Sequence, residues 1–256
     1  VTLTLTASPA SGSTCVDAVD AMTLTITPMA TASAGSNATI CESAVSHQLA
    51  ATATNYSSVT WTTSGTGTFS NIHVEDPIYT PSAADITAGT VTLTLTAYGN
   101  APCGNATSSM VLTIDRQPVA SAGDDATRCS TATSFSVSTA TASHYDALLW
   151  SHNGTGTLTD ETTLTPTYTF GANETGVVTL ILTASPASGS TCVDAVDAMT
   201  LTITPMATAS AGSNATICES QVSHQLAATA TNYSSVTWAT SGTGTFSNIH
   251  VEDPIY

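Results

Sequence analysis

The chain has almost no positive charge. It contains no lysine and two arginines, Arg116 and Arg128, against 18 acidic residues, which gives a formal net charge of −16. Binding to nucleic acid or to an anionic membrane depends on Lys and Arg near phosphates, so the sequence argues against both partners. Without lysine, a Lys–Asn isopeptide cross-link is also excluded, and any covalent bracing must come from cysteine.

Long apolar runs and helical periodicity are missing as well. No stretch of 18 or more apolar residues occurs, so membrane insertion is not expected. Charged residues make up 8% of the chain, so Thr, Ser, Asn and Ala must supply most of the surface. Residues 82–90, with Asp85 and Ile86, allow a single helical turn and nothing longer.

Most of the chain is a repeat of itself. Residues 178–256 repeat residues 1–79 at an offset of 177, and 76 of the 79 positions agree. The three changes are Thr4 to Ile181, Ala44 to Gln221 and Thr62 to Ala239. Such a repeat indicates a tandem array, and we expect the chain to be a section of a longer repetitive polymer.

A shorter period lies within this repeat. Cys41 recurs as Cys129 at an offset of 88, and Trp61 recurs as Trp150 at an offset of 89. Two diverged domain types therefore alternate. The predicted parts are 1–30, the C-terminal strands of a partial domain; 31–118, a type 1 domain; 119–207, a type 2 domain; and 208–256, the N-terminal strands of a partial type 1 domain.

Strict alternation of apolar residues and threonine predicts strands. In 91–97, Val91, Leu93 and Leu95 share one face, and threonines occupy the other. Similar patterns or short apolar runs between turns predict strands at 1–7, 22–26, 39–41, 45–54, around Trp61, 77–81, 110–114, 178–184 and 199–203. About seven strands per domain with one Trp on the third favour an all-β fold of immunoglobulin-like Greek-key β-sandwiches arranged head to tail.

A resemblance to a known family rests on the run AGSNATIC…SSVTW…SGTGTFSN…GTVTLTLTA…PCGNAT. This text resembles the PKD-like, Ig-like tandem repeats of very large secreted cell-surface proteins of Bacteroidetes-type bacteria, over nearly the whole chain. The resemblance implies an extracellular array of sandwiches that serves as a stalk, adhesin or fibre.

Six cysteines recur at fixed places in the repeats: Cys15, Cys41, Cys103, Cys129, Cys192 and Cys218. Regular cysteines in a charge-poor β-array indicate disulfides formed in an oxidising compartment. No CxxC spacing occurs, which disfavours a zinc site.

Two connectivities remain open. One bridge per domain would pair Cys41 with Cys103 and Cys129 with Cys192. However, a strand of six to eight residues separates the two ends of a sandwich by about 20 Å, whereas the Cα atoms of a disulfide lie within about 7 Å. We therefore favour a bridge between successive domains, Cys41 with Cys192, which leaves four cysteines to find other partners.

Aromatic and histidine residues give little sign of a site. Trp61, Trp150 and Trp238 occupy one repeated position, which favours core packing over a sugar-stacking platform. The histidines are two repeated pairs, His47 with His224 and His73 with His250, together with His144 and His152. Positions copied along an array usually serve structure, and we expect no catalytic residues and no enzyme.

Acidic pairs offer the best metal hypothesis. Asp124, Asp125, Asp160 and Glu161 fall in predicted turns, and calcium takes six to eight oxygen ligands. No calcium-loop spacing accompanies them, so solvated loop acids are the favoured interpretation and calcium the alternative. No other cofactor is expected.

The sequence therefore predicts a structural protein of an extracellular filament or cell-surface fibre, braced by disulfides. An adhesin stalk, or a module that binds a glycan or a host protein, is the alternative. The expected partners are copies of the chain or further repeats of it. Residues 1–30 of one copy could complete 208–256 of another by strand donation. About ten residues equivalent to 80–90 would then be missing, which favours one continuous chain.

Overall fold

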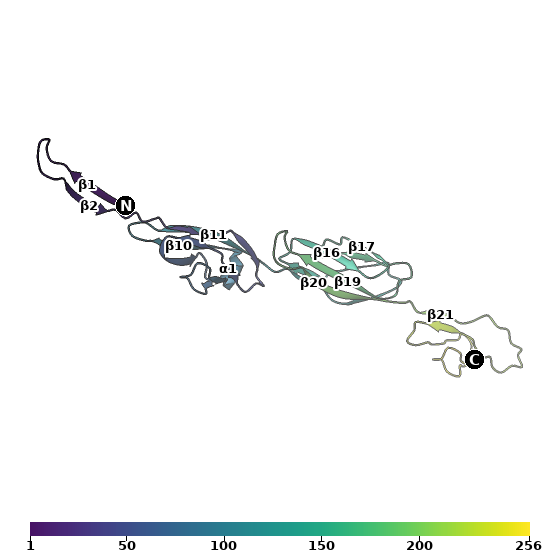
Figure 1. Ribbon diagram of the computed structural model, residues 1–256. Coiled ribbons are helices and arrows are strands. Elements are labelled where there is room, and N and C mark those ends of the chain that lie inside the picture. Colours follow the sequence, from purple (N-terminus) through teal and green to yellow (C-terminus); the bar gives the residue numbers. More distant parts are fainter. The chain divides into compact units, whose positions relative to one another are not determined.

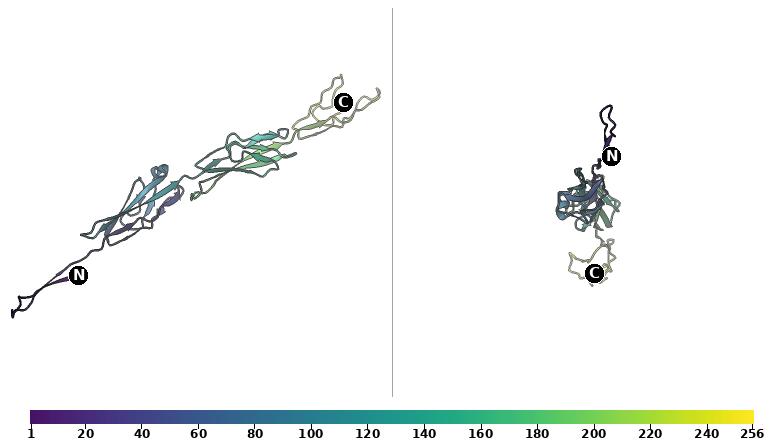
Figure 2. Two further views of the ribbon diagram at one scale, coloured as in Figure 1. Left: turned by 90° about the horizontal axis from the view of Figure 1, so that it is seen from above. Right: turned by 60° about the vertical axis from the view of Figure 1, so that its left-hand side comes forward.

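The computed structural model describes residues 1–256 and shows an all-β protein with a single short helix. It divides into two compact units: Val1–Gln117 with Pro186–Val193, and Pro118–Ser185 with Asp194–Tyr256. Each unit holds one complete immunoglobulin-like sandwich, whose strands can be followed in Figures 1 and 2. Each unit also holds a smaller part: a lone hairpin at the start of the chain in the first, and a half-sandwich at its end in the second.

The first sandwich has one large sheet with the strand order β4–β11–β10–β7, opposed by a pair β3–β6 and a triplet β5–β9–β8. Its elements are β3 (Thr31–Ser33), β4 (Ala38–Cys41), β5 (His47–Gln48), β6 (Thr52–Thr54), β7 (Tyr56–Thr63), β8 (Thr68–Phe69), β9 (Ile78–Thr80), α1 (Ala83–Ala88), β10 (Thr90–Gly99) and β11 (Ala106–Asp115). β4 runs parallel to β11, and the other neighbours are antiparallel.

The second sandwich repeats this plan with the order β13–β20–β19–β16, the pair β12–β15 and the triplet β14–β18–β17. Its strands are β12 (Val119–Ser121), β13 (Ala126–Cys129), β14 (Ser134–Ser136), β15 (Thr141–Ser143), β16 (Ala147–His152), β17 (Thr157–Thr159), β18 (Thr167–Thr169), β19 (Gly176–Ser185) and β20 (Ala195–Thr204). In both sandwiches the last two strands form a long final hairpin, which contributes the two central strands of the large sheet.

The remaining strands stand apart from any complete sandwich. β1 (Thr2–Ala7) and β2 (Ala18–Thr23) pair only with each other, and β21 (Thr208–Ser210) pairs only with β22 (Thr229–Thr231). We call residues 1–30 the lone hairpin, visible at the purple end of the ribbon in Figure 1, and residues 208–256 the half-sandwich. They correspond to the final hairpin and to the preceding strands of a sandwich, respectively.

Burial follows the alternation seen in the sequence. On β10, Val91, Leu93 and Leu95 are buried, whereas Thr92 faces solvent. Trp61 and Trp150 lie in the two cores. Trp238, the third residue of this kind, is half buried within residues 208–256, so its core position stays a prediction.

The single strand expected at 45–54 is two strands. β5 pairs with β9, and β6 pairs with β3 in the other part of the layer, so the chain changes partner between them. At the change, the backbone N–H of Ala51 donates to Asp76 Oδ1 at 2.7 Å. The Asp76 carboxylate thus accepts the hydrogen bond that the carbonyl of a paired strand would otherwise accept. The hydrophobic pattern alone does not reveal this change of partner.

The segment 82–90 forms a true helix, α1, although the sequence predicted at most one turn. Ser82 and Asp85 form a capping box, and Gly89 ends the helix with a φ of 76°. The second sandwich has turns and no helix at this place. No helix in the structure is long and apolar enough to cross a membrane.

The inner face of β10 should dominate the stability of the first sandwich. Leu95→Ala removes a side chain that is fully buried beside Trp61, and should lower the free energy of unfolding by about 2–5 kcal/mol. Thr92→Ala, on the exposed face of the same strand, should change it by less than about 0.5 kcal/mol. Urea titration of both variants measures the difference, and equal effects would contradict the assigned faces.

Candidate functional site

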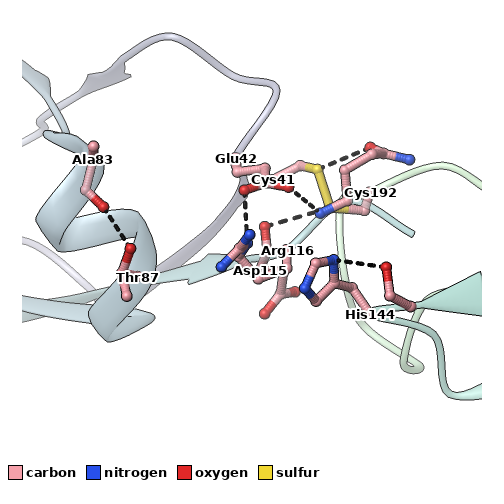
Figure 3. Close-up of polar contacts among 10 residues, drawn as sticks. Cys41, Glu42, Ala83, Thr87, Asp115, Arg116, His144 and Cys192 are labelled. Atoms are coloured by element: carbon pink, nitrogen blue, oxygen red, sulfur yellow. Dashed lines mark hydrogen bonds and ion pairs between the residues drawn. A yellow bond between two sulfur atoms is a disulfide. The ribbon is translucent and has the colours of Figure 1, made fainter. Parts of the chain in front are cut away.

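The most distinctive chemical feature is a disulfide between residues far apart in sequence. Cys41 and Cys192 are bonded with an S–S distance of 1.99 Å and a Cα–Cα distance of 4.8 Å across a sequence separation of 151 (Figure 3). Cys41 ends β4 of the first sandwich. Cys192 lies in the loop between β19 and β20, in the segment 186–193 that belongs to the first unit.

Strand geometry explains why Cys41 does not pair within its own sandwich. Cys41 is in register with Asp115, the last residue of β11, whereas Cys103 lies beyond the first residue, Ala106. The nine residue steps from Ala106 to Asp115 span about 30 Å at ~3.3 Å per residue. The alternative pairs, Cys41 with Cys103 and Cys129 with Cys192, are therefore wrong, and Cys103 and Cys129 are free.

Polar contacts hold residues 116–117, which link the first sandwich to the second, beside this disulfide. Glu42 forms an ion pair with Arg116 at 2.8 Å, shown in Figure 3, and its other carboxylate oxygen accepts from the backbone N–H of Gln117 at 2.9 Å. Gln117 Nε2 in turn donates to the carbonyl of Val193 at 2.7 Å. Residues 116–117 are thus bound both to the end of β4, which carries Cys41, and to the loop that carries Cys192.

The four free cysteines occupy the same two kinds of position. Cys129 and Cys218 correspond to the strand-end Cys41, and Cys15 and Cys103 correspond to the loop cysteine Cys192. Cys103 Sγ lies 3.1 Å from the carbonyl oxygen of Thr27, as Cys192 Sγ lies 3.6 Å from that of Asp115. Thr27 and Asp115 are themselves equivalent, so the setting of the bonded loop cysteine recurs around a free one.

A carboxylate network also lies in each sandwich, buried in the first and half-buried in the second, and the sequence reasoning missed both. Asp85, 2% exposed, accepts hydrogen bonds from the backbone N–H groups of Thr66 and Gly67 at 2.9 Å each. It also accepts from the N–H of Ser82 and from the Tyr79 hydroxyl, at 3.0 and 2.8 Å. Asp85 therefore ties the Ser64–Gly67 turn to the start of α1.

The second sandwich builds the same network with a longer side chain. Glu174 accepts from the N–H groups of Thr155 and Gly171, at 2.6 and 2.8 Å, and from the Tyr168 hydroxyl at 2.8 Å. Glycine is required in the turn, since a Cβ at Gly154 would collide with the Tyr168 hydroxyl. A tyrosine six residues before an acid, together with the preceding Gly-Thr-Gly, is the sequence signal that could have found the network.

These contacts shift the pKa values of both partners. Burial alone would raise the pKa of Asp85, but the hydrogen bonds from Ser82, Thr66, Tyr79 and Gly67 outweigh it and hold that pKa below its usual value. The pKa of Glu174 is lowered in the same way against the effect of burial. Burial, the largest cause, raises the pKa values of Tyr79 and Tyr168 to about 12, so both hydroxyls remain donors at neutral pH.

The predicted calcium ligands are not assembled into a site. No group of three or more His, Cys, Asp or Glu side chains gathers anywhere in the chain. Asp125 instead accepts from the backbone N–H of Thr200 at 2.7 Å, and Asp124, Asp160 and Glu161 are exposed. The hydrogen bond of Asp125 ties β20 to the segment before β13, which is a structural role.

The histidines are likewise dispersed. His73 Nδ1 lies 3.2 Å from the carbonyl of Val59, and His250 repeats this contact with Val236. His152 packs against the Tyr168 ring, and His144 is exposed. His47 pairs with Tyr79 in the ladder between β5 and β9. None of these side chains lies in a hydrogen-bonded arrangement with a nucleophile and an acid.

No family model matches this chain, and no curated protein matches it. Among solved structures, a three-Ig-domain structure of titin has 11% identity and a TM-score of 0.45, with 86% of this chain and 84% of that one covered. Mouse clustered PcdhgC3 EC1-3 has 12% identity and a TM-score of 0.43, with 79% and 76% covered. Extracellular domains 3-5 of Drosophila OTK have 11% identity and a TM-score of 0.43 over 66% of this chain, which spans 59% of the OTK structure.

The carboxylate of Asp85 should make the first sandwich sensitive to acid. Because its folded-state pKa lies below the unfolded value of about 3.9, its contribution is complete above about pH 4 and is lost as pH falls through the folded pKa. Asp85→Asn should lower the free energy of unfolding at pH 7 by about 1–3 kcal/mol and remove this acid dependence. Hydrogen exchange of the β10 amides, measured between pH 2 and 7, reports on this sandwich alone.

The matched control is Asp124→Asn, which changes an exposed acid of the same type. We expect its stability profile to follow that of the unchanged chain. If Asp85→Asn retained the full acid dependence, the buried carboxylate would not be its source.

Proposed function

We propose that this chain is a structural protein of an extracellular filament or cell-surface fibre, in which disulfides join successive Ig-like domains. The observation that carries the proposal is the bond between Cys41 and Cys192, whose cysteines come from the sequences of two consecutive sandwiches. A bond of this kind serves mechanical continuity, and repetition of like domains supplies length. An adhesin stalk would use the same disulfides between successive domains.

The disulfide changes the path of a tensile load along the chain. Force applied at the two ends passes from Cys41 directly to Cys192 and bypasses the residues between them, which include most of both sandwiches. Those residues can unfold without lengthening the molecule while the bond is intact. The sandwiches are thus protected from extension, which suits a fibre and has no evident use in an enzyme.

The same bond supports the proposal of an extracellular location. Structural disulfides persist in oxidising compartments and are rare in the cytosol. The threonine-rich outer faces of β7 and β10, with few charges, suit a surface that stays in solution without binding polyanions. We propose a location outside the cell or at its surface, and partners that are further domains of the same kind.

Immunogold labelling of the producing cells tests the function. Antibodies raised against residues 31–207 should decorate filaments or fibres outside the cell at regular intervals. Labelling confined to the cytosol, or to surface regions without fibres, would refute the proposal. A glycan array with the same chain separates a fibre from a binding module, because a purely structural chain should bind no glycan selectively.

Single-molecule stretching should reveal the bypass directly. When the chain is held by its ends and pulled under oxidising conditions, the segment between Cys41 and Cys192 should add nothing to the measured contour length. Reduction of the bond should release 151 residue steps, a further contour length of about 500 Å at ~3.3–3.6 Å per residue. Cys41→Ser should give the reduced behaviour without reductant, and Cys103→Ser should behave like the unchanged chain. Equal contour lengths in all four cases would exclude a load-bearing disulfide.

A further inference from the structure

We propose that the outer face of the large sheet in the second sandwich packs against the same face of a second copy of this chain. This pairing rests on the proposed structural function and specifies how neighbouring fibres associate side by side. The face is formed by β16, β19 and β20, which are labelled in Figure 1. All three strands belong to one complete sandwich.

Four apolar side chains gather on this face, outside the core. Leu149 on β16 and Val196 on β20 are 55% and 62% exposed. Thr183 on β19 lies between them, because it pairs with Leu149 on one side and with Val196 on the other. Ile181 pairs with Ala198, and its diagonal neighbours Leu149 and Val196 lie about 7–8 Å away. We call Leu149, Ile181, Val196 and Ala198 the apolar patch.

The first sandwich carries hydroxyl groups at the same places. The equivalents of the four patch residues, in the same order, are Thr60, Thr94, Thr107 and Ser109. The hydroxyls of Thr94 and Ser109 are hydrogen-bonded to each other at 2.8 Å. The shared fold therefore does not require apolar residues on its outer face, and the patch is a property of the second domain type.

The strands that form the face carry no charge on it. Their outward residues are Ala147, Leu149 and Ser151 on β16, Val177, Thr179, Ile181, Thr183 and Ser185 on β19, and Val196, Ala198, Thr200, Thr202 and Thr204 on β20. The acid within β20, Asp197, has the opposite orientation and accepts from the N–H of Ala122 at 2.8 Å. Asp194 immediately precedes β20. Two such faces can therefore meet without burying an unpaired charge, which is costly.

This lack of charge makes a second copy the suitable partner. The chain has a net charge of −16, so two copies repel each other wherever their acidic surfaces approach. Salt screens this repulsion beyond about 8 Å under physiological conditions, which leaves uncharged surfaces as the ones that can come into contact. The outward residues include no aromatic ring on which a sugar could stack and no charge that would attract an ionic ligand.

The face is also suited to packing against itself. Two sheets that pack face to face lie about 10 Å apart, with their strands inclined by about 30°. A two-fold axis between the copies brings the same patch to both sides of the contact. With this axis along β19, Leu149 of one copy meets Val196 of the other, and the two Ile181 side chains lie near the axis.

The size of the face makes a single pairing weak. Three strands about 4.8 Å apart and about 30 Å long present roughly 400 Å² per copy. Two copies then bury roughly 800 Å² in total, below the about 1,200 Å² at which stable specific interfaces begin. The sequence repeats with an offset of 177 residues, so each further repeat adds another pairing between two long chains. Many weak contacts thus join two fibres, whereas isolated domains remain soluble.

Sedimentation equilibrium of the 256-residue chain tests the pairing. Its free thiols are first alkylated with iodoacetamide, so that no disulfide forms between copies. We expect the average mass to rise from 25.8 kDa towards twice that value between about 10 µM and about 1 mM, the range expected for an interface of this size. Addition of about 0.5 M NaCl should strengthen the pairing, because it screens the repulsion between acidic copies. A monomer at every concentration and salt overturns the proposal.

A charge at the centre of the patch gives the sharpest variant. Thr183→Asp should abolish the rise in mass, because each copy would bury a carboxylate against an apolar surface. Thr96→Asp is the matched control, since Thr96 occupies the same place between β7 and β11 in the first sandwich. We expect the control to associate like the unchanged chain. Equal association of the two variants would show that the face is not the site of contact.

Two milder variants use residues that the chain itself has at equivalent places. Leu149→Thr introduces the residue found at Thr60, and Ile181→Thr introduces the residue found at Thr4, so neither should disturb folding. Each should raise the Kd of the pair about tenfold, because two copies of the side chain leave the interface. Val111→Thr, on the outer face of the first sandwich, should leave the Kd unchanged. An unchanged Kd in both patch variants contradicts the assignment.

Other outcomes separate this pairing from the proposed function. A chain that stays monomeric, together with immunogold-labelled fibres that lie singly outside the cell, would reject the pairing and leave the structural function intact. Labelling confined to the cytosol would reject the structural function even if the chain pairs. Selective glycan binding that Thr183→Asp abolishes would assign the face to a glycan and overturn the pairing.

Discussion

Burial of one face of the final hairpin is the constraint on which each sandwich depends. β10–β11 and β19–β20 supply the central strands of the large sheets and most of the fully buried leucines. The parallel edge strand, the Trp on the opposite edge strand (β7 or β16) and the position of both types of cysteine are all defined relative to this hairpin. Where the hairpin is separated from the other strands, as at the two ends of the chain, the same residues remain exposed.

The hairpin also explains the position of the disulfide. Its long strands hold the loop and the strand end at opposite extremes of one sandwich, about 30 Å apart at ~3.3 Å per residue. A cysteine at each extreme cannot meet its neighbour in the same domain, and the loop cysteine Cys192 meets the strand-end Cys41 instead. A sandwich too long for an internal bridge thus becomes a domain that is joined to the next.

Two carboxylates are held by hydrogen bonds and not by ion pairs. Asp85, which is buried, and Glu174, which is half-buried, each accept from backbone N–H groups and a tyrosine hydroxyl. Loss of one such acceptor would leave several donors without a partner, which costs more than the loss of a surface ion pair. The networks hold the glycine turns in place through these hydrogen bonds.

The sequence by itself determined the strands, their inner faces and the repeat. The alternation of Thr with Val, Leu and Ile is a local pattern, and in a strand it places the apolar residues on one face and the threonines on the other. It also predicted the cysteine positions, although two connectivities remained open. Only the tertiary structure decided between them, since the distance from Cys41 to Cys103 depends on which strands pair. The fold likewise decided the split at Ala51 and the burial of Asp85, because each depends on partners outside its own segment. The helix after Ser82 differs, since its capping box and its terminal Gly89 are local signals.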